Sequence, residues 1–219
     1  MTDAGYMKYY CFIDFEFTCD GKIIINETGE IKFKGKHYFK GRDLLAVGLI
    51  IMDSDFEIVK RYYRTVKPLY NSKLTDYCLA LTKLKQEDID RSHDAVFVVN
   101  EVMNILKKYE IKNVFCYGDC DIPYLKLTSA RVRKAGLNYK VIESLTGKLK
   151  NISPDINKKF VSDLPMGISE LCGIFSFDNN ENAHNAFYDA EALAKIYRAV
   201  YCSEHNDHLR YLEYINVRT

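Results

Sequence analysis

Residues 11–18 read Cys-Phe-Ile-Asp-Phe-Glu-Phe-Thr, a run of β-prone apolar residues that carries two carboxylates two positions apart. In a strand, residues i and i+2 share a face, so Asp14 and Glu16 project together while the apolar side chains between them project to the other side. Like charges on so apolar a strand are costly, and a divalent cation between them removes both the repulsion and the desolvation penalty. The strand is therefore interpreted as half of a metal site, although an Asp-x-Glu pair alone is also typical of a solvated edge strand.

The composition favours one domain with a sizeable core, because the chain has 219 residues of which 47% are hydrophobic. A net charge of +1, from 31 basic and 30 acidic residues, argues against tight and indiscriminate binding to duplex or membrane surfaces. The seven cysteines form no C-x-x-C pair, which favours reduced thiols in a cytoplasmic protein. No apolar run is long enough to predict a membrane span.

The segment 20–42 is predicted to form a β-hairpin. Lys22–Ile25 is followed by a turn-like stretch at 26–30 and by the strictly alternating Ile31–Lys34. The alternation predicts one packed face and one face that bears Lys32, Lys34 and Lys36.

The rest of the chain changes from strand to helix patterns after Pro68, with a short helix around residues 74–84. Strands are expected at 44–52, 56–66 and 113–117, and helices at 95–109 (capped by Ser92 or Asp94), from near Pro123, at 168–175 and at 185–201. Residues 179–182 read as a polar loop, and the turn-rich stretch 137–165 gives no clear element. This order predicts an α/β sheet whose early strands are antiparallel and whose later strand is parallel.

The last predicted helix contains a second acidic signal. Asp189 falls on its apolar stripe, where a carboxylate that faces the core needs a partner. His184 is five residues earlier and could not share that face within one continuous helix, so we place it in the loop before the first turn, leaning over the same cavity. Alone, His184 would read as a polar loop histidine.

A further carboxylate is available where the strand 113–117 runs into its helix, at Asp119 or Asp121. Asp119 could be a turn residue after Gly118, and Asp121 could be a helix cap. The residues alone leave both positions open.

Together these residues resemble the DEDDh group of 3′-to-5′ exonucleases. Asp14-Phe15-Glu16 is similar to the first motif of that group, Asp121 in the stretch 117–125 to the second, and His184 to Asp189 to the third. The stretches 81–89 and 166–171 also resemble the group, and its ERI-1-like branch, whose members trim RNA, is the most similar. Asn185 stands where the related tyrosine variant would need tyrosine.

The resemblance implies a ribonuclease-H-like fold with a mixed five-stranded sheet, three antiparallel strands followed by parallel strands, flanked by helices. The domain would span 1–219, with a core at about 8–200, the 20–42 hairpin as an insertion and a tail at 202–219. The expected activity is hydrolysis of the 3′ end of single-stranded nucleic acid, preferably RNA, to nucleoside 5′-monophosphates. A proofreading-type DNA exonuclease and a non-catalytic binding regulator remain alternatives.

The resemblance also implies a site with two Mg²⁺ or Mn²⁺ ions. Asp14 would bridge both ions, Glu16 and Asp189 would complete the water-activating site, and Asp121 would support the second ion. His184 would take the proton from the attacking water.

Substrate contacts are expected from a basic stretch, since residues 126–160 hold nine Lys or Arg against Glu143 and Asp155. This stretch could equally be a solvated helix face. The candidate substrate-binding residues are Phe17, Thr18, Tyr124, Arg131, Arg133 and Lys134. The spacing Cys202-x-x-His205-x-x-His208 could align three metal ligands, although a polar helix end is the more common use of such a pattern.

Overall fold

The computed structural model describes residues 8–25, 31–35, 42–160, 165–177 and 183–202. The predicted loop at 179–182, the hairpin turn at 26–30, Lys36 and the C-terminal histidines lie outside these residues.

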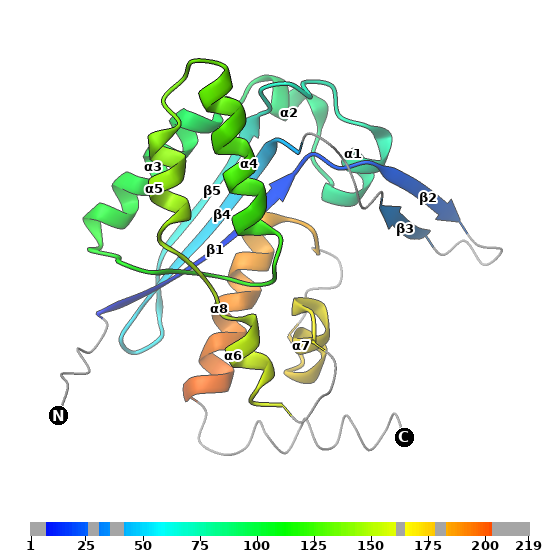
Figure 1. The fold of residues 1–219 in the computed structure, drawn as a ribbon. Coiled ribbons are helices and arrows are strands. Elements are labelled where there is room, and N and C mark those ends of the chain that lie inside the picture. Colours follow the sequence, from blue (N-terminus) through cyan, green and yellow to red (C-terminus); the bar gives the residue numbers. More distant parts are fainter. Residues whose placement is uncertain (1–7, 26–30, 36–41, 161–164, 178–182, 203–219) are drawn as a thin grey trace.

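A mixed β-sheet forms the centre of the molecule (Figure 1). Its strands, in spatial order, are β6 (His93–Asp94), β5 (Ile58–Lys67), β4 (Leu44–Asp53), β1 (Tyr9–Phe17), β7 (Val114–Cys116) and β8 (Leu149–Asn151). Strands β1, β4 and β5 pair antiparallel, and β7 and β8 continue the sheet in parallel with β1. The predicted three antiparallel strands followed by parallel strands are confirmed, with the two-residue strand β6 as an addition at the edge of β5.

Helices cover both faces of the sheet (Figure 1). The helices are α1 (Asp76–Thr82), α2 (Gln86–Asp90), α3 (Ala95–Lys108), α4 (Asp121–Lys134), α5 (Lys140–Thr146), α6 (Ser153–Asn157), α7 (Ile168–Ile174) and α8 (Ala186–Cys202). Helices α3, α4 and α5 share one buried cluster with the odd-numbered side chains of β1, such as Ile13 and Phe15. Helices α6, α7 and α8 pack on the other face around Phe12. On that second face the side chains of β1 are apolar only as far as Phe12. The next two side chains of β1 on the same face are those of Asp14 and Glu16.

The helix predicted from near Pro123 begins two residues earlier, at Asp121. Proline is tolerated throughout a first turn because the backbone N–H groups there have no partner within the helix. Asp121 is therefore the first helical residue. The unassigned stretch 137–165 contains α5, β8 and α6, which are too short to produce a readable period.

The predicted hairpin consists of β2 (Gly21–Ile25) and β3 (Ile31–Gly35), which form a separate two-stranded sheet beside the main one. The prediction of a packed apolar face is wrong. Ile23 and Phe33 are each 39% exposed, and Ile25 and Ile31 are 66% and 56% exposed. The alternation is present, but α1 contacts this face only as far as Phe33, so Ile25 and Ile31 beyond it stay exposed in the part of the chain that the structure describes.

Among the described side chains are six of the seven cysteines, and all six are free thiols. Among the described helices, none combines the length and the apolar character needed to cross a membrane.

Candidate active site

Strand β1 carries the first two acidic side chains of the site. Asp14 and Glu16 project from the same face, opposite Gly48 and Ala46 of the neighbouring strand β4. Both partners are small, so the space above this part of the sheet is free for another element.

Helix α8 occupies that space. A Cβ atom added at Gly48 would overlap the backbone carbonyl of Ala186 and the backbone nitrogen of Phe187. The first turn of α8 therefore lies directly on β4, and only a glycine at position 48 permits this approach. A glycine inside an apolar strand is a sequence signal of close backbone approach, and the sequence reading did not use it.

The close approach brings Asp189 into the site. One carboxylate oxygen from each of Asp14, Glu16 and Asp189 lies within 4.8 Å of the others. The Oδ2 atom of Asp189 also accepts a hydrogen bond of 3.0 Å from the backbone N–H of His184. This bond holds the carboxylate in place and ties it to the residue in front of the helix.

His184 lies in the loop immediately before α8, where the sequence reading placed it. Its backbone has a positive φ of 64°, a left-handed conformation that reverses the chain at this point. Asn185 then caps the helix, since its side-chain oxygen accepts from the backbone N–H of Phe187 at 3.1 Å. His184 is exposed, and its backbone N–H is the group that contacts the carboxylate of Asp189.

Asp121 is the fourth acidic residue of the cluster. Strand β7 runs parallel to β1, so the first turn of α4 begins near the carboxyl end of β1. Asp121 is 6% exposed, and its Oδ2 atom is buried without a hydrogen-bond partner among the described residues. Asp119, by contrast, is exposed and accepts a 3.0 Å hydrogen bond from Asn151. The geometry thus favours Asp121 over Asp119 as the residue that faces the cluster.

Burial and mutual repulsion disfavour ionisation of these acids. Burial, followed by the charges of Asp121, Glu16 and Asp189, raises the pKa of Asp14 well above its usual range. Burial and then the charges of Asp189 and Asp121 raise the pKa of Glu16 to about 8, and burial followed by Asp189 raises the pKa of Asp121 to about 7. The three carboxylates that lie within 4.8 Å of one another are an oxygen donor set suited to hard divalent cations. Asp121 is close enough for its charge to raise the pKa of Asp14, and its unpaired Oδ2 fits the same use.

The sequence model of a protein family described as Exonuclease matches residues 11–197. This span includes all four acids and His184. The chain belongs to the exonuclease family.

Curated relatives of this exonuclease include the 3′-5′ exoribonuclease 1 proteins of Rattus norvegicus and Homo sapiens. Each is 26% identical, over 114 and 115 residues respectively, which is 52% of this chain. The matched region spans only 29% of the length of those relatives.

Solved structures share the fold. The nuclease domain of 3′hExo, described as a DEDDh family member and bound to rAMP, superposes with a TM-score of 0.67 at 20% identity, covering 88% of this chain and 91% of that chain. The cell-death related nuclease 4 gives a TM-score of 0.62 at 15% identity, covering 88% and 63%. The ribonuclease-H-like exonuclease fold predicted from the sequence is therefore confirmed.

Three of the predicted substrate-binding residues lie at the end of β1 and the start of α4. Phe17 is buried, and its ring contacts the edge of Tyr124 with centroids 5.2 Å apart. Thr18 is buried too, and its hydroxyl accepts a 2.8 Å hydrogen bond from the backbone N–H of Asp43. Tyr124 is half-buried, and the guanidinium of Arg42 lies 4.5 Å from its ring centroid. Of the three, only Tyr124 has a side chain that a nucleotide could reach readily.

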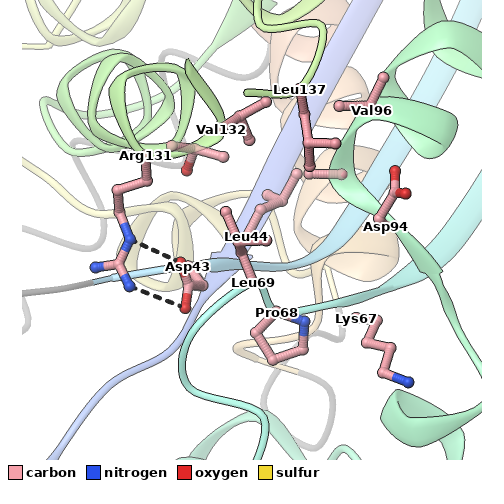
Figure 2. A pocket seen from close by; sticks show the side chains of 12 residues that line it. Asp43, Leu44, Lys67, Pro68, Leu69, Asp94, Val96, Arg131, Val132 and Leu137 are labelled. Carbon is pink, nitrogen blue, oxygen red and sulfur yellow. Dashed lines mark hydrogen bonds and ion pairs between the residues drawn. The ribbon is translucent and has the colours of Figure 1, made fainter. Parts of the chain in front are cut away.

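The side chain of Arg131 forms an ion pair with Asp43 of the same chain (Figure 2). Its Nε lies 3.0 Å from Oδ1 of Asp43 and its Nη2 lies 3.3 Å from Oδ2, while the ring of Tyr70 stacks on the guanidinium at 4.4 Å. Asp43 also accepts hydrogen bonds from the backbone N–H groups of Tyr70 and Asn71. A mainly apolar cavity of about 240 Å³ beside the pair is lined by α3 and α4, on the sheet face opposite the acids.

Arg133 and Lys134 lie at the far end of α4. Both are exposed, and Arg133 lies over the ring of Tyr139 at 5.2 Å. An α-helix rises about 1.5 Å per residue, so these side chains start about 18 Å along the helix from Asp121. The structure therefore does not bring them together with the acidic cluster.

Proposed function

We propose that this chain is a metal-dependent 3′-to-5′ exonuclease that removes nucleoside 5′-monophosphates from the 3′ end of single-stranded RNA. The observation that carries the proposal is the convergence of Asp14, Glu16, Asp121 and Asp189 beside His184, in a chain of the exonuclease family. Relatives named as 3′-5′ exoribonucleases support the RNA substrate and the direction of cleavage.

The four carboxylates would hold Mg²⁺ or Mn²⁺. Asp14 would bridge two ions, a role supported by its position on β1 within 4.8 Å of carboxylate oxygens of both Glu16 and Asp189. Glu16 and Asp189 would complete one ion site, and Asp121 would complete the other. When bound, divalent cations stabilise the charge that develops on the phosphoryl oxygens and on the leaving 3′ oxygen, and they make the attacking water more acidic.

His184 would act as the general base. The residue is exposed, and the bond from its backbone N–H to Asp189 fixes its main chain beside the cluster. One of the ring nitrogens would take the proton from the attacking water, a task for which an imidazole side chain is suited. The half-buried ring of Tyr124 would contact the terminal base.

The substrate surface and the cellular setting are also part of the proposal. Tyr124, Arg133 and Lys134 would contact the nucleic acid at increasing distance from the site, whereas Phe17, Thr18 and Arg131 would support the fold beneath it. The exonuclease domain would comprise one unit at about 8–200. Six free thiols support a cytoplasmic location.

The test is digestion of matched single-stranded RNA and DNA oligonucleotides in Mg²⁺, in Mn²⁺ and in chelator. We expect metal-dependent shortening from the 3′ end, faster on RNA, and strong slowing in His184→Ala. Faster digestion of DNA would assign a DNA exonuclease instead. Binding of either strand without shortening in any metal would contradict catalysis and favour a binding regulator.

A further inference from the structure

The hairpin formed by β2 and β3 concentrates positive charge in a chain that is close to neutral. The segment 21–42 contains six Lys or Arg residues against two acids, Glu27 and Glu30, whereas the whole chain has a net charge of only +1. The described bases of the segment are Lys22, Lys32, Lys34 and Arg42.

The strand register gathers the lysines on one face of the hairpin. Lys22 is paired directly with Lys34, and Ile24 with Lys32, so all three lysines share a face. Like charges directly opposite each other destabilise a strand pair. Among the described residues, no carboxylate forms an ion pair with Lys22 or Lys34, and both side chains are exposed. An anionic ligand would relieve this repulsion.

The opposite face of the hairpin is turned toward α1. Phe33 contacts the edge of Tyr77 with ring centroids 5.7 Å apart. A Cβ atom at Gly21 would overlap the Tyr77 ring, and one at Gly35 would lie 3.2 Å from its hydroxyl. Because Gly21, Gly35 and Phe33 share one face, the lysine face points away from α1.

The root of the hairpin is fixed to the part of the molecule that carries the acidic site. The backbone N–H of Thr18 donates to the carbonyl of Asp43 at 2.8 Å, and the Asp43 N–H donates back to the Thr18 hydroxyl at the same distance. The two strands thus leave the sheet at the carboxyl end of β1, as Figure 1 shows. Lys22 follows Glu16 by six residues, and so few residues span at most about 20 Å.

We propose that the lysine face of the β2–β3 hairpin binds the phosphate backbone of the substrate strand upstream of its 3′ nucleotide. The proposal rests on the exonuclease function proposed above and names a second contact surface for the same substrate. Lysine ammonium groups recognise phosphates as point charges without reading sequence, so the hairpin would add affinity for long strands and no base preference.

The test compares Lys22→Gln/Lys34→Gln with the matched control Lys107→Gln/Lys112→Gln. The control removes the same charge from two exposed lysines at the amino-terminal end of the parallel strands. Each protein is titrated with a fluorescent 20-nucleotide RNA in chelator at several salt concentrations, and is assayed in Mg²⁺ on the same RNA and on a dinucleotide. A dinucleotide contains only the phosphodiester that is cleaved, so it has no upstream phosphate for the hairpin.

We expect the hairpin variant to bind the 20-nucleotide RNA about tenfold more weakly than the control. The slope of log affinity against log salt should fall by about 1.4, because each phosphate contact on a single strand contributes about 0.7. Turnover of the dinucleotide should be unchanged. Thermal melting of both variants should match the wild type, which excludes misfolding as the cause.

Equal RNA affinity and equal salt slope in the hairpin variant and its control would overturn the proposal, provided that the wild type degrades RNA. If the wild type degrades no substrate in any metal, the proposed function itself fails, which is a separate result. A further variant, Ile25→Thr/Ile31→Thr, examines the exposed apolar face. A dimeric wild type that becomes monomeric in this variant, with RNA affinity unchanged in the lysine variant, would assign the hairpin to self-association instead.

Discussion

The acidic site and the β2–β3 hairpin both hold like charges together, but they do so in opposite environments. The carboxylates of Asp14 and Glu16 are half-buried and that of Asp121 is buried, and burial is the largest cause of their raised pKa values. Lys22 and Lys34 face each other across two exposed strands.

The difference shows that solvent exposure determines whether a cluster of like charges is stable without protons or counterions. Water screens the exposed lysines, so they can remain charged and attract phosphate only moderately. Buried carboxylates must take up protons or bind cations, because repulsion and desolvation both act on them. Changes to the acidic site should therefore have large effects, and changes to the hairpin small ones that depend on salt.

The largest effect is expected from Asp14→Asn. Cation stabilisation of the reaction is worth several kcal/mol, so turnover of RNA should fall by at least about 10⁴-fold. Asp119→Asn is the matched control, because it removes an exposed carboxylate that bonds to Asn151. Single-turnover digestion of 3′-labelled RNA measures both variants. Loss of activity in Asp119→Asn with retention in Asp121→Asn would reverse the assignment of the fourth acid.

His184→Ala is expected to have the next largest effect. Loss of a general base typically costs about 10² to 10⁴ in rate. Added imidazole should restore part of the activity, since the ring is exposed and the backbone bond to Asp189 does not depend on the side chain. His93→Ala, which removes an exposed ring stacked on Phe97, serves as the control. Wild-type turnover in His184→Ala would exclude this residue as the base.

Arg131→Gln should affect stability instead of substrate affinity. Removing one partner of a buried ion pair leaves the other charge uncompensated, and Asp43 is almost fully buried. We expect the free energy of unfolding to fall by about 3 kcal/mol, the low end of the usual range, because backbone N–H groups still donate to Asp43. Urea unfolding measures this change. Unchanged stability with a raised KM would return Arg131 to the substrate surface.

A further effect is expected in the pH dependence of stability without metal. Glu16 and Asp121, with pKa values of about 8 and about 7 in the folded protein, keep protons that the unfolded chain has already released above about pH 4. Folding therefore takes up protons, and stability falls as the pH rises from about 4 to about 8. The melting temperature in chelator should drop across this range, and saturating Mg²⁺ should reduce the drop. A melting temperature in chelator that rises steadily with pH would contradict the raised pKa values.

The residues of the acidic cluster could be predicted because local periodicity determines their directions. The two-residue period of a strand puts Asp14 and Glu16 on one face, and the stripe of the last helix orients Asp189 inward. The resemblance to a known group then linked segments that are far apart in the sequence. The residues alone left Asp119 and Asp121 open, because both follow the same short strand; the resemblance pointed to Asp121, and its burial supports that choice.

The wrong predictions concern contacts between segments that are far apart in the sequence. The alternation in the hairpin is present, but a two-residue period does not tell whether another element covers the apolar face, and Ile25 and Ile31 are exposed. Arg131 looked like a substrate contact because it belongs to a basic stretch, and its partner Asp43 lies far away in the sequence. Long-range pairing of this kind leaves no local pattern.

Binding of Mn²⁺ tests the central claim most directly, since that claim is that the buried carboxylates form a cation site. The measurement is titration calorimetry of the wild type and of Asp14→Asn at pH 7.5, in two buffers with different ionisation enthalpies. We predict that the wild type binds Mn²⁺ and releases protons as the acids ionise, and that Asp14→Asn loses this binding. Wild-type binding no stronger than that of Asp14→Asn would contradict the account.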